Sequence, residues 1–173
     1  MTDLLRRILP TVQKPARYTG GEFNEIKKDL ADVRIRVAFC FPDTYEIGMS
    51  NLGMRILYGV LNKEEDVWCE RVYDPWLDMQ DKMKEYDIPL TACESGDELT
   101  AFDMIGFTLQ YEMSYTNVLN MLDLAKIPLR SKDRDESMPI IIGGGPCAYN
   151  PEPVADFFDL FNIGEGEEML PEL

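Results

Sequence analysis

The stretch IIIGGGPC, residues 140–147, joins three isoleucines to three glycines, a proline and a cysteine. The β-branched run is typical of a strand. Glycines at the end of a strand allow positive φ and let another group approach the backbone closely. The stretch therefore predicts a strand that ends either in a tight strand-to-helix turn or in the floor of a ligand site.

Similar apolar runs alternate with helical patterns along the rest of the chain. Ser50 is expected to cap one helix, and Asp74 with Pro75 and Asn150 with Pro151 are expected to open two more. Further strands are expected at residues 34–40, 67–73, 104–110 and 160–163, with 88–92 as a candidate short edge strand, and a further helix is expected at 114–125. Strands separated by helices imply right-handed crossovers and a mostly parallel sheet. We therefore predict an α/β fold, a three-layer α/β/α sandwich with a Rossmann-like (flavodoxin-like), mostly parallel five-stranded sheet over residues 33–173, preceded by an N-terminal helical arm over residues 1–32.

Composition excludes several classes of function. The net charge of -15 repels phosphate backbones and argues against a nucleic-acid surface. No run approaches the roughly 18 apolar residues of a membrane span, so we expect no membrane partner and a cytoplasmic location. Histidine is absent, which removes the commonest metal ligand and general base. The four cysteines lie too far apart for a zinc or iron–sulfur motif, so no protein metal ligand is predicted.

The unusual loops, residues 41–50, 110–114, 143–150 and 164–168, all follow expected strands. In a parallel sheet, loops after the strands meet at one edge, where ligands bind at the topological switch point. The glycine triplet has neither the GxxxxGK[ST] nor the GxGxxG spacing, so a phosphate cradle is not expected. The loop positions thus favour a cofactor site at the carboxyl edge of the sheet.

Four motifs carry a family resemblance. FPDTYEIGMSNLG at residues 41–53, GFTLQYEMSYTN at 106–117, GGGPCAYNPEP at 143–153 and GEGE at 164–167 closely resemble the amino-terminal region of cobalamin-binding radical SAM proteins. The resemblance implies a B12-binding domain followed by a radical SAM barrel, which carries a CxxxCxxC motif for a 4Fe-4S cluster and uses S-adenosylmethionine. That motif is absent here, so the chain resembles an excised domain whose partner is the barrel of the same polypeptide.

The resemblance also implies site residues. The B12 motif DxHxxG corresponds to Asp43, Thr44, Tyr45 and Gly48, with tyrosine at the histidine position, so cobalt coordination from below is not expected. The motif SxL corresponds to Thr108, Leu109 and Gln110, whose hydroxyl and side chains would line the slot of the nucleotide tail. The motif GG corresponds to Gly143 and Gly144, and Gly145 and Gly164 complete the expected cobalamin-binding set.

Other interpretations stay open at this stage. The domain could be a flavodoxin-like module that binds another flat cofactor such as a flavin, or a degenerate B12 domain that serves only as an interaction module. Asp43, Tyr45 and Thr108 also have plain structural interpretations as a turn carboxylate, a partly buried aromatic and a strand residue. An apolar stripe in the arm is expected to pack on the missing domain or, alternatively, on this domain's own core; its exposure would favour a homodimer. The stripe comprises Leu4, Leu5, Ile8 and Leu9.

Overall fold

The computed structural model describes residues 3–173 and contains one five-stranded sheet. The strands lie in the order β2-β1-β3-β4-β5, and every neighbouring pair is parallel. The strands are β1 (Ile35–Phe41), β2 (Val67–Tyr73), β3 (Met104–Thr108), β4 (Ile140–Gly144) and β5 (Leu160–Phe161). The predicted parallel five-stranded sheet is confirmed.

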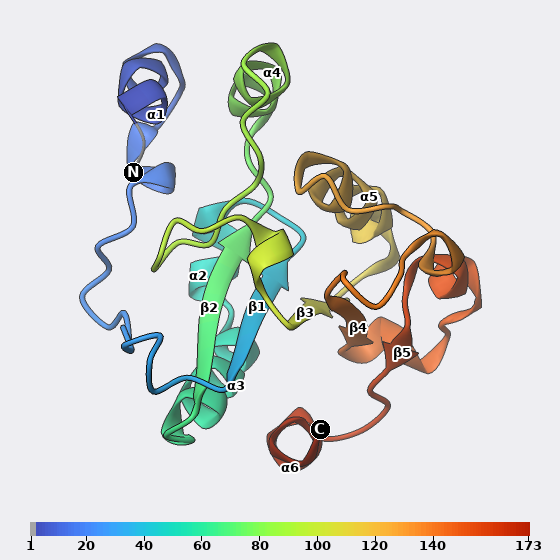
Figure 1. The fold of residues 1–173 in the computed structure, drawn as a ribbon. Helices are drawn as coiled ribbons and strands as arrows, with labels where there is room; N and C mark the ends of the chain where they lie inside the picture. The colour runs from blue at the N-terminus through green and yellow to red at the C-terminus, as the bar shows by residue number, and fades with distance from the viewer. Residues whose placement is uncertain (1–2) are drawn as a thin grey trace.

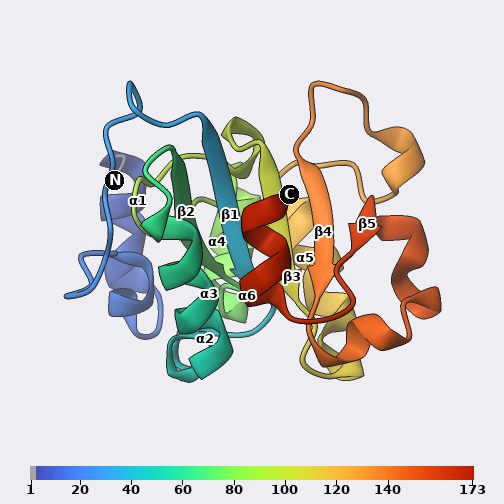
Figure 2. The ribbon, with the colours of Figure 1, turned by 90° about the horizontal axis from the view of Figure 1, so that it is seen from below.

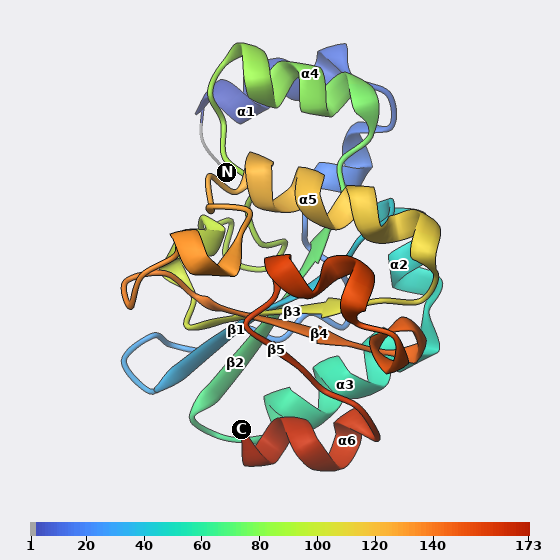
Figure 3. The ribbon, with the colours of Figure 1, turned by 90° about the vertical axis from the view of Figure 1, so that its right-hand side faces the viewer.

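Helices cover both faces of this sheet, as Figures 1 and 3 show. One face carries α1 (Asp3–Ile8), α4 (Leu77–Glu85) and α5 (Tyr115–Leu124), and the other carries α2 (Tyr45–Ser50), α3 (Leu52–Lys63) and α6 (Gly166–Met169). The 3₁₀ helices are Leu9–Thr11, Pro15–Tyr18, Leu99–Ala101, Glu112–Ser114, Ser131–Asp133, Pro146–Tyr149, Glu152–Phe157 and Leu170–Glu172. The three-layer α/β/α arrangement is thus confirmed, and no helix within residues 3–173 is both long and apolar enough to cross a bilayer.

The order of the strands decides which part of the sheet each helix covers. From β1 the chain moves outward to β2 through α3, then crosses back and continues through β3, β4 and β5 in the opposite direction. Because parallel crossovers are right-handed, this reversal places the later connections, with α4 and α5, on the opposite face from α3. On the α3 side, α6 returns from β5 and lies beside α3 in front of the central strands (Figure 2).

Alternation along β1 divides the core into two clusters. Ala38 and Cys40 are fully buried on the side of α4 and α5. Val37, Phe39 and Phe41 point to the other side, where α3 covers them. This period of two follows from the pleat of a strand, and it determines which residues of β3 and β4 face α3 and α6.

Local expectations about strand and helix ends needed correction. Residues 88–92 form no strand and make a single antiparallel bridge, between Thr91 and Glu98. Pro89 has no N–H to donate to a ladder, which fits this outcome. Asn51, not Ser50, caps α3, because its Oδ1 accepts a hydrogen bond from the Met54 N–H at 2.9 Å.

The two Asx-Pro pairs do not open α-helices directly. The helix after Asp74 begins only at Leu77, and the Asp74 carboxylate instead accepts a hydrogen bond from Asn120 at 2.8 Å. After Asn150 and Pro151 the chain forms a 3₁₀ helix rather than an α-helix. Tertiary hydrogen bonding has therefore replaced local capping at the first pair.

The N-terminal stripe packs mainly on the domain itself. Ile8 and Leu9 are 4% and 8% exposed, and Ile8 belongs to the same cluster as Met79 and Met83 of α4. Leu4 stays half exposed. The interpretation that the stripe packs on a further domain is therefore wrong for Ile8 and Leu9, and the alternative, packing on this core, holds.

Candidate functional site

A slot of about 220 Å³ lies between the sheet and helices α3 and α6. Its apolar walls come from β1, α3 and the segment around α6, and it reaches the carboxyl ends of β3 and β4. Six glycines contribute to its lining: Gly53, Gly106, Gly144, Gly145, Gly164 and Gly166. The other lining residues include Phe39, Leu57, Leu61, Met104, Thr108, Gln110, Ile142, Asn162 and Leu170.

The floor of the slot is open because two strand positions lack side chains. Gly106 pairs with Phe39 on one side and Ile142 on the other, and Thr108 pairs with Gly144. A Cβ placed on Gly144 would have nothing nearer than Asn162, at 3.9 Å. Gly145 has φ +93 and lies against the Leu109 backbone, so this position requires glycine. The bare backbone of the glycine stretch therefore forms both a turn and the floor of a cavity.

Gly143 does not line this slot. It precedes Gly144 in the strand and faces the opposite side of the sheet, where a Cβ would lie 2.8 Å from the Phe161 ring and 3.2 Å from Phe158. The missing side chain thus makes room for an aromatic ring of the protein's own core. The two glycines expected to act together are separated by the pleat of β4.

The second predicted element, residues 108–110, does reach the slot. Gln110 Nε2 donates to Thr108 Oγ1 at 2.6 Å, and both residues line the cavity. Leu109 between them is fully buried; its N–H donates to the Gly144 carbonyl at 2.7 Å, and its carbonyl accepts from Cys147 N–H at 3.0 Å. Leu109 therefore fixes the ends of β3 and β4 together instead of lining the slot.

The first predicted element lies beyond the end of β1, outside the slot lining. Asp43 accepts hydrogen bonds from the Thr44 N–H at 2.6 Å and from the Tyr111 hydroxyl. Gly48 is buried against the Tyr73 ring, which occupies the space that a Cβ on this glycine would need. These residues order the edge of the sheet next to α2, while Gly164, in the segment after β5, lines the slot.

Tyr45 is held away from the slot by the N-terminal arm. Its hydroxyl donates to Glu22, and its ring packs edge-on against Tyr73 with centroids 5.4 Å apart. Burial and the hydrogen bond to Glu22 raise the pKa of Tyr45 to about 12. The phenol is therefore neutral near pH 7, and a neutral phenol is a weak metal ligand.

Asn162 is a slot residue that the sequence analysis missed. It directly follows β5, its N–H donates to the Gly143 carbonyl at 2.8 Å, and the residue is 6% exposed. Among the residues that the structure describes, none forms a hydrogen bond with its buried Oδ1. The available signal was an asparagine inside the apolar run LFNI just before the GEGE motif.

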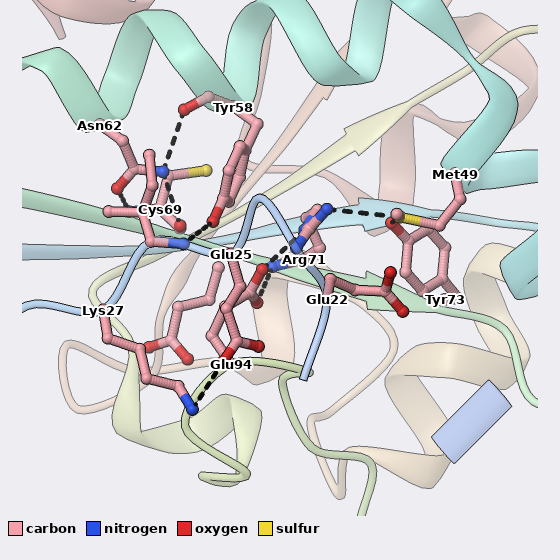
Figure 4. Close-up of polar contacts among 12 residues, drawn as sticks. Glu22, Glu25, Lys27, Met49, Tyr58, Asn62, Cys69, Arg71, Tyr73 and Glu94 are labelled. Carbon is pink, nitrogen blue, oxygen red and sulfur yellow. Dashed lines mark hydrogen bonds and ion pairs between the residues drawn. The ribbon is translucent and has the colours of Figure 1, made fainter. Parts of the chain in front are cut away.

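A separate polar cluster lies on the β2 side of the domain (Figure 4). Arg71 Nε donates to Glu94 Oε1 at 2.6 Å, and the Arg71 N–H donates to the other carboxylate oxygen at 2.7 Å. The guanidinium carbon lies 4.5 Å from the centre of the Tyr58 ring, and Nη1 lies 3.4 Å from Met49 Sδ. Both charged side chains are almost completely buried, so this ion pair fixes the loop of Glu94 to β2.

Asp74 lines a second cavity, of about 380 Å³, between the N-terminal arm and the loop after α4. Burial raises the pKa of its carboxyl group to about 7, although the hydrogen bond from Asn120 opposes this shift. No group of three or more metal-ligating side chains occurs in the described part of the chain. The glycine-lined slot is the better candidate for a cofactor site because more of the predicted site residues line it: Thr108, Gln110, Gly144, Gly145 and Gly164.

The fold and the slot define a doubly wound α/β domain of the flavodoxin type, with its cavity beside the switch point between β1 and β3. The model of the N-terminal region of radical SAM proteins matches residues 53–173, so the chain belongs to this family. The expected membership among the N-terminal regions of radical SAM proteins is thereby confirmed.

Two further proteins are similar to parts of the chain. An uncharacterised protein of Methanocaldococcus jannaschii is 30% identical over 134 residues, which are 76% of this chain and 24% of that relative. The crystal structure of a cobalamin-binding protein from Desulfitobacterium hafniense aligns with 80% of this chain and 57% of its own, with a TM-score of 0.45 and 12% identity. The chain thus spans about a quarter of the relative from M. jannaschii.

Proposed function

We propose that this domain binds cobalamin for a radical SAM enzyme and that the glycine-lined slot receives the nucleotide tail of the cofactor. The observation that carries the proposal is the open floor at Gly144, between Thr108 and Asn162 and next to the switch point of the sheet. Membership in the family of radical SAM N-terminal domains supports it. The tail would enter the slot, and the corrin ring would lie outside it at the carboxyl edge of the sheet.

The residues present fit such a ligand. The slot offers bare backbone for a close approach, apolar walls from Phe39 and Leu57, and polar groups on Thr108 and Asn162. Ligand pockets generally combine mostly apolar walls with a few precisely placed polar groups, and the slot has this composition. No histidine exists to bind cobalt, and Tyr45 is bound to Glu22, so this chain would hold cobalamin without a side-chain ligand on the metal.

In the whole enzyme, cobalamin would supply a methyl group or tune radical chemistry that begins with S-adenosylmethionine cleavage at the 4Fe-4S cluster of the barrel. The part played by this chain is binding and orientation. Leu109 and Gly145 fix the ends of β3 and β4, and these strand ends set the width of the slot.

Retention of hydroxocobalamin during gel filtration tests the proposal. Corrin absorbance should elute with the 173-residue chain and with Tyr45→Phe, but not with Gly144→Val, whose side chain would project into the slot. Gly59→Val is the matched control, because a Cβ at Gly59 in α3 meets nothing within 4 Å and Gly59 does not line the slot. Circular dichroism confirms folding of each variant.

Two outcomes would contradict the proposal. Equal retention by folded Gly144→Val and by the parent would remove the slot as the binding site. Binding of flavin mononucleotide with no binding of cobalamin would favour the flavodoxin-like alternative.

A further inference from the structure

Asn162 Oδ1 is a buried hydrogen-bond acceptor without a partner in the described part of the chain. The residue is 6% exposed and belongs to the lining of the slot. A buried polar atom without a partner costs about 1–3 kcal/mol, and native proteins contain few of them. Such an atom in the wall of a ligand slot points to a hydrogen-bond donor on the ligand.

Thr108 supplies the complementary group across the same floor. Its Oγ1 accepts the hydrogen bond from Gln110, and its own hydrogen has no acceptor among residues 3–173. A Cβ placed on Gly144 would lie 3.9 Å from the Cβ and the backbone oxygen of Asn162, and a Cβ placed on Gly145 would lie 3.3 Å from Thr108 Oγ1. The two glycines of the β4 end thus lie between Asn162 on the β5 side and Thr108, with its free hydroxyl hydrogen, on the β3 side.

We infer that Asn162 accepts a hydrogen bond from a ribose hydroxyl of the nucleotide tail and thereby positions the tail in the slot. This inference rests on the proposed function. The tail offers O–H donors on its ribose, whereas its neutral dimethylbenzimidazole base has no N–H to donate. Thr108 would donate to an acceptor of the same tail, so donor and acceptor together fix its orientation.

A comparison of cobalamin with cobinamide isolates this contact, because cobinamide has the corrin ring but lacks the ribose and the base. Affinities are measured by absorbance titration of each corrinoid into the folded chain. Asn162→Leu keeps the size of the side chain and removes the acceptor. We expect it to weaken cobalamin binding about fivefold to thirtyfold, the range for a ligand donor left unpaired in a buried site, and to leave cobinamide binding unchanged.

Two further variants complete the experiment. Asn162→Asp keeps an oxygen acceptor of the same reach and should lose less cobalamin affinity than Asn162→Leu. Asn24→Leu makes the same chemical change at an exposed asparagine outside the slot lining and should affect neither corrinoid. Circular dichroism and urea unfolding of each variant show whether the fold is retained.

The outcomes separate this inference from the proposed function. One outcome is that the parent binds cobalamin and that Asn162→Leu loses affinity equally for both corrinoids, or for neither. This outcome would refute the role of Asn162 and leave the proposed function standing. Absence of binding of both corrinoids to the parent would refute the proposed function and this inference with it. Selective loss of cobalamin affinity in Asn162→Leu supports both.

Discussion

Alanine at Gly143 and at Gly144 should have opposite consequences, although the two glycines are adjacent. At Gly143 the new Cβ lies 2.8 Å from the Phe161 ring, which is closer than real Cβ contacts, so the ring must shift. Overpacking of this kind costs about 1–3 kcal/mol, and the lower entropy of the unfolded alanine chain returns about 0.4–1 kcal/mol. We therefore expect Gly143→Ala to lower the free energy of unfolding by about 1–2 kcal/mol.

At Gly144 the nearest atoms to a new Cβ are those of Asn162, at 3.9 Å, an ordinary contact distance. The backbone there does not have the positive φ found at Gly145. Gly144→Ala should therefore leave stability unchanged or raise it by about 0.4–1 kcal/mol, through the unfolded state. Its methyl group projects into the slot, so cobalamin retention should fall in this variant and not in folded Gly143→Ala.

Urea unfolding followed by circular dichroism measures the first effect, with unchanged m-values as evidence that the unfolded states are comparable. Gel filtration with hydroxocobalamin measures the second. If Gly144→Ala proved as destabilising as Gly143→Ala, or if Gly143→Ala matched the parent, the assignment of the two glycines to opposite faces would be refuted.

Three further predictions concern the surroundings of the slot. Tyr45→Phe removes the hydrogen bond to Glu22 and should lower the free energy of unfolding in urea by about 0.5–1.5 kcal/mol, with cobalamin retention unchanged. Loss of cobalamin retention without loss of stability would instead indicate that Tyr45 contacts the cofactor. Burial raises the pKa of Asp74 to about 7, so its contribution to stability is present below about pH 4 and is lost as the pH rises towards 7. Asp74→Asn should therefore exceed the parent in stability at pH 8 by about 1–3 kcal/mol, and thermal unfolding curves of parent and variant with the same pH dependence would contradict this. Glu94→Gln leaves the Arg71 charge buried without its counter-ion and should lower the free energy of unfolding by about 3 kcal/mol or more. The double variant Arg71→Met with Glu94→Leu should recover part of that loss. If urea unfolding showed a smaller loss of stability for the single variant than for the double variant, this would argue against a buried ion pair.

The sheet was predictable because its strands have strong local signals. Apolar β-rich runs mark each strand, and the helices between them force parallel pairing. Parallel pairing then brings Thr108 and Gly144 to one edge, so this part of the site followed from the sequence. Helix starts were less predictable, because Asp74 bonds to Asn120, a residue far away in the sequence, instead of capping the nearby helix.

The face on which each glycine lies could not be read from the sequence. Alternation reveals a face only when one side of the strand is polar. Ile141 and Ile142 are 0% and 4% exposed, so hydropathy is the same on both sides of β4. The assignment of Gly143 to the core and Gly144 to the slot therefore depends on the register of β4 with β3, which only the folded sheet defines.

The role of Asn162 depends on the return path of the chain after β5. Gly164 has φ +140, which few residues other than glycine adopt, and it turns the chain back toward α3. Gly166 then lies against Leu57 of α3, where a Cβ on this glycine would be 3.1 Å from the leucine side chain. A four-residue helix such as α6 has too few positions for an amphipathic pattern, so its place over the sheet leaves no periodic signal. The right-handed crossovers place the connecting helices α4 and α5 on the opposite face of the sheet, so it is the segment that returns after β5 that closes the slot around Asn162. The residues of GEGE therefore contribute to the slot through the position they give to α6 as well as through their own contacts.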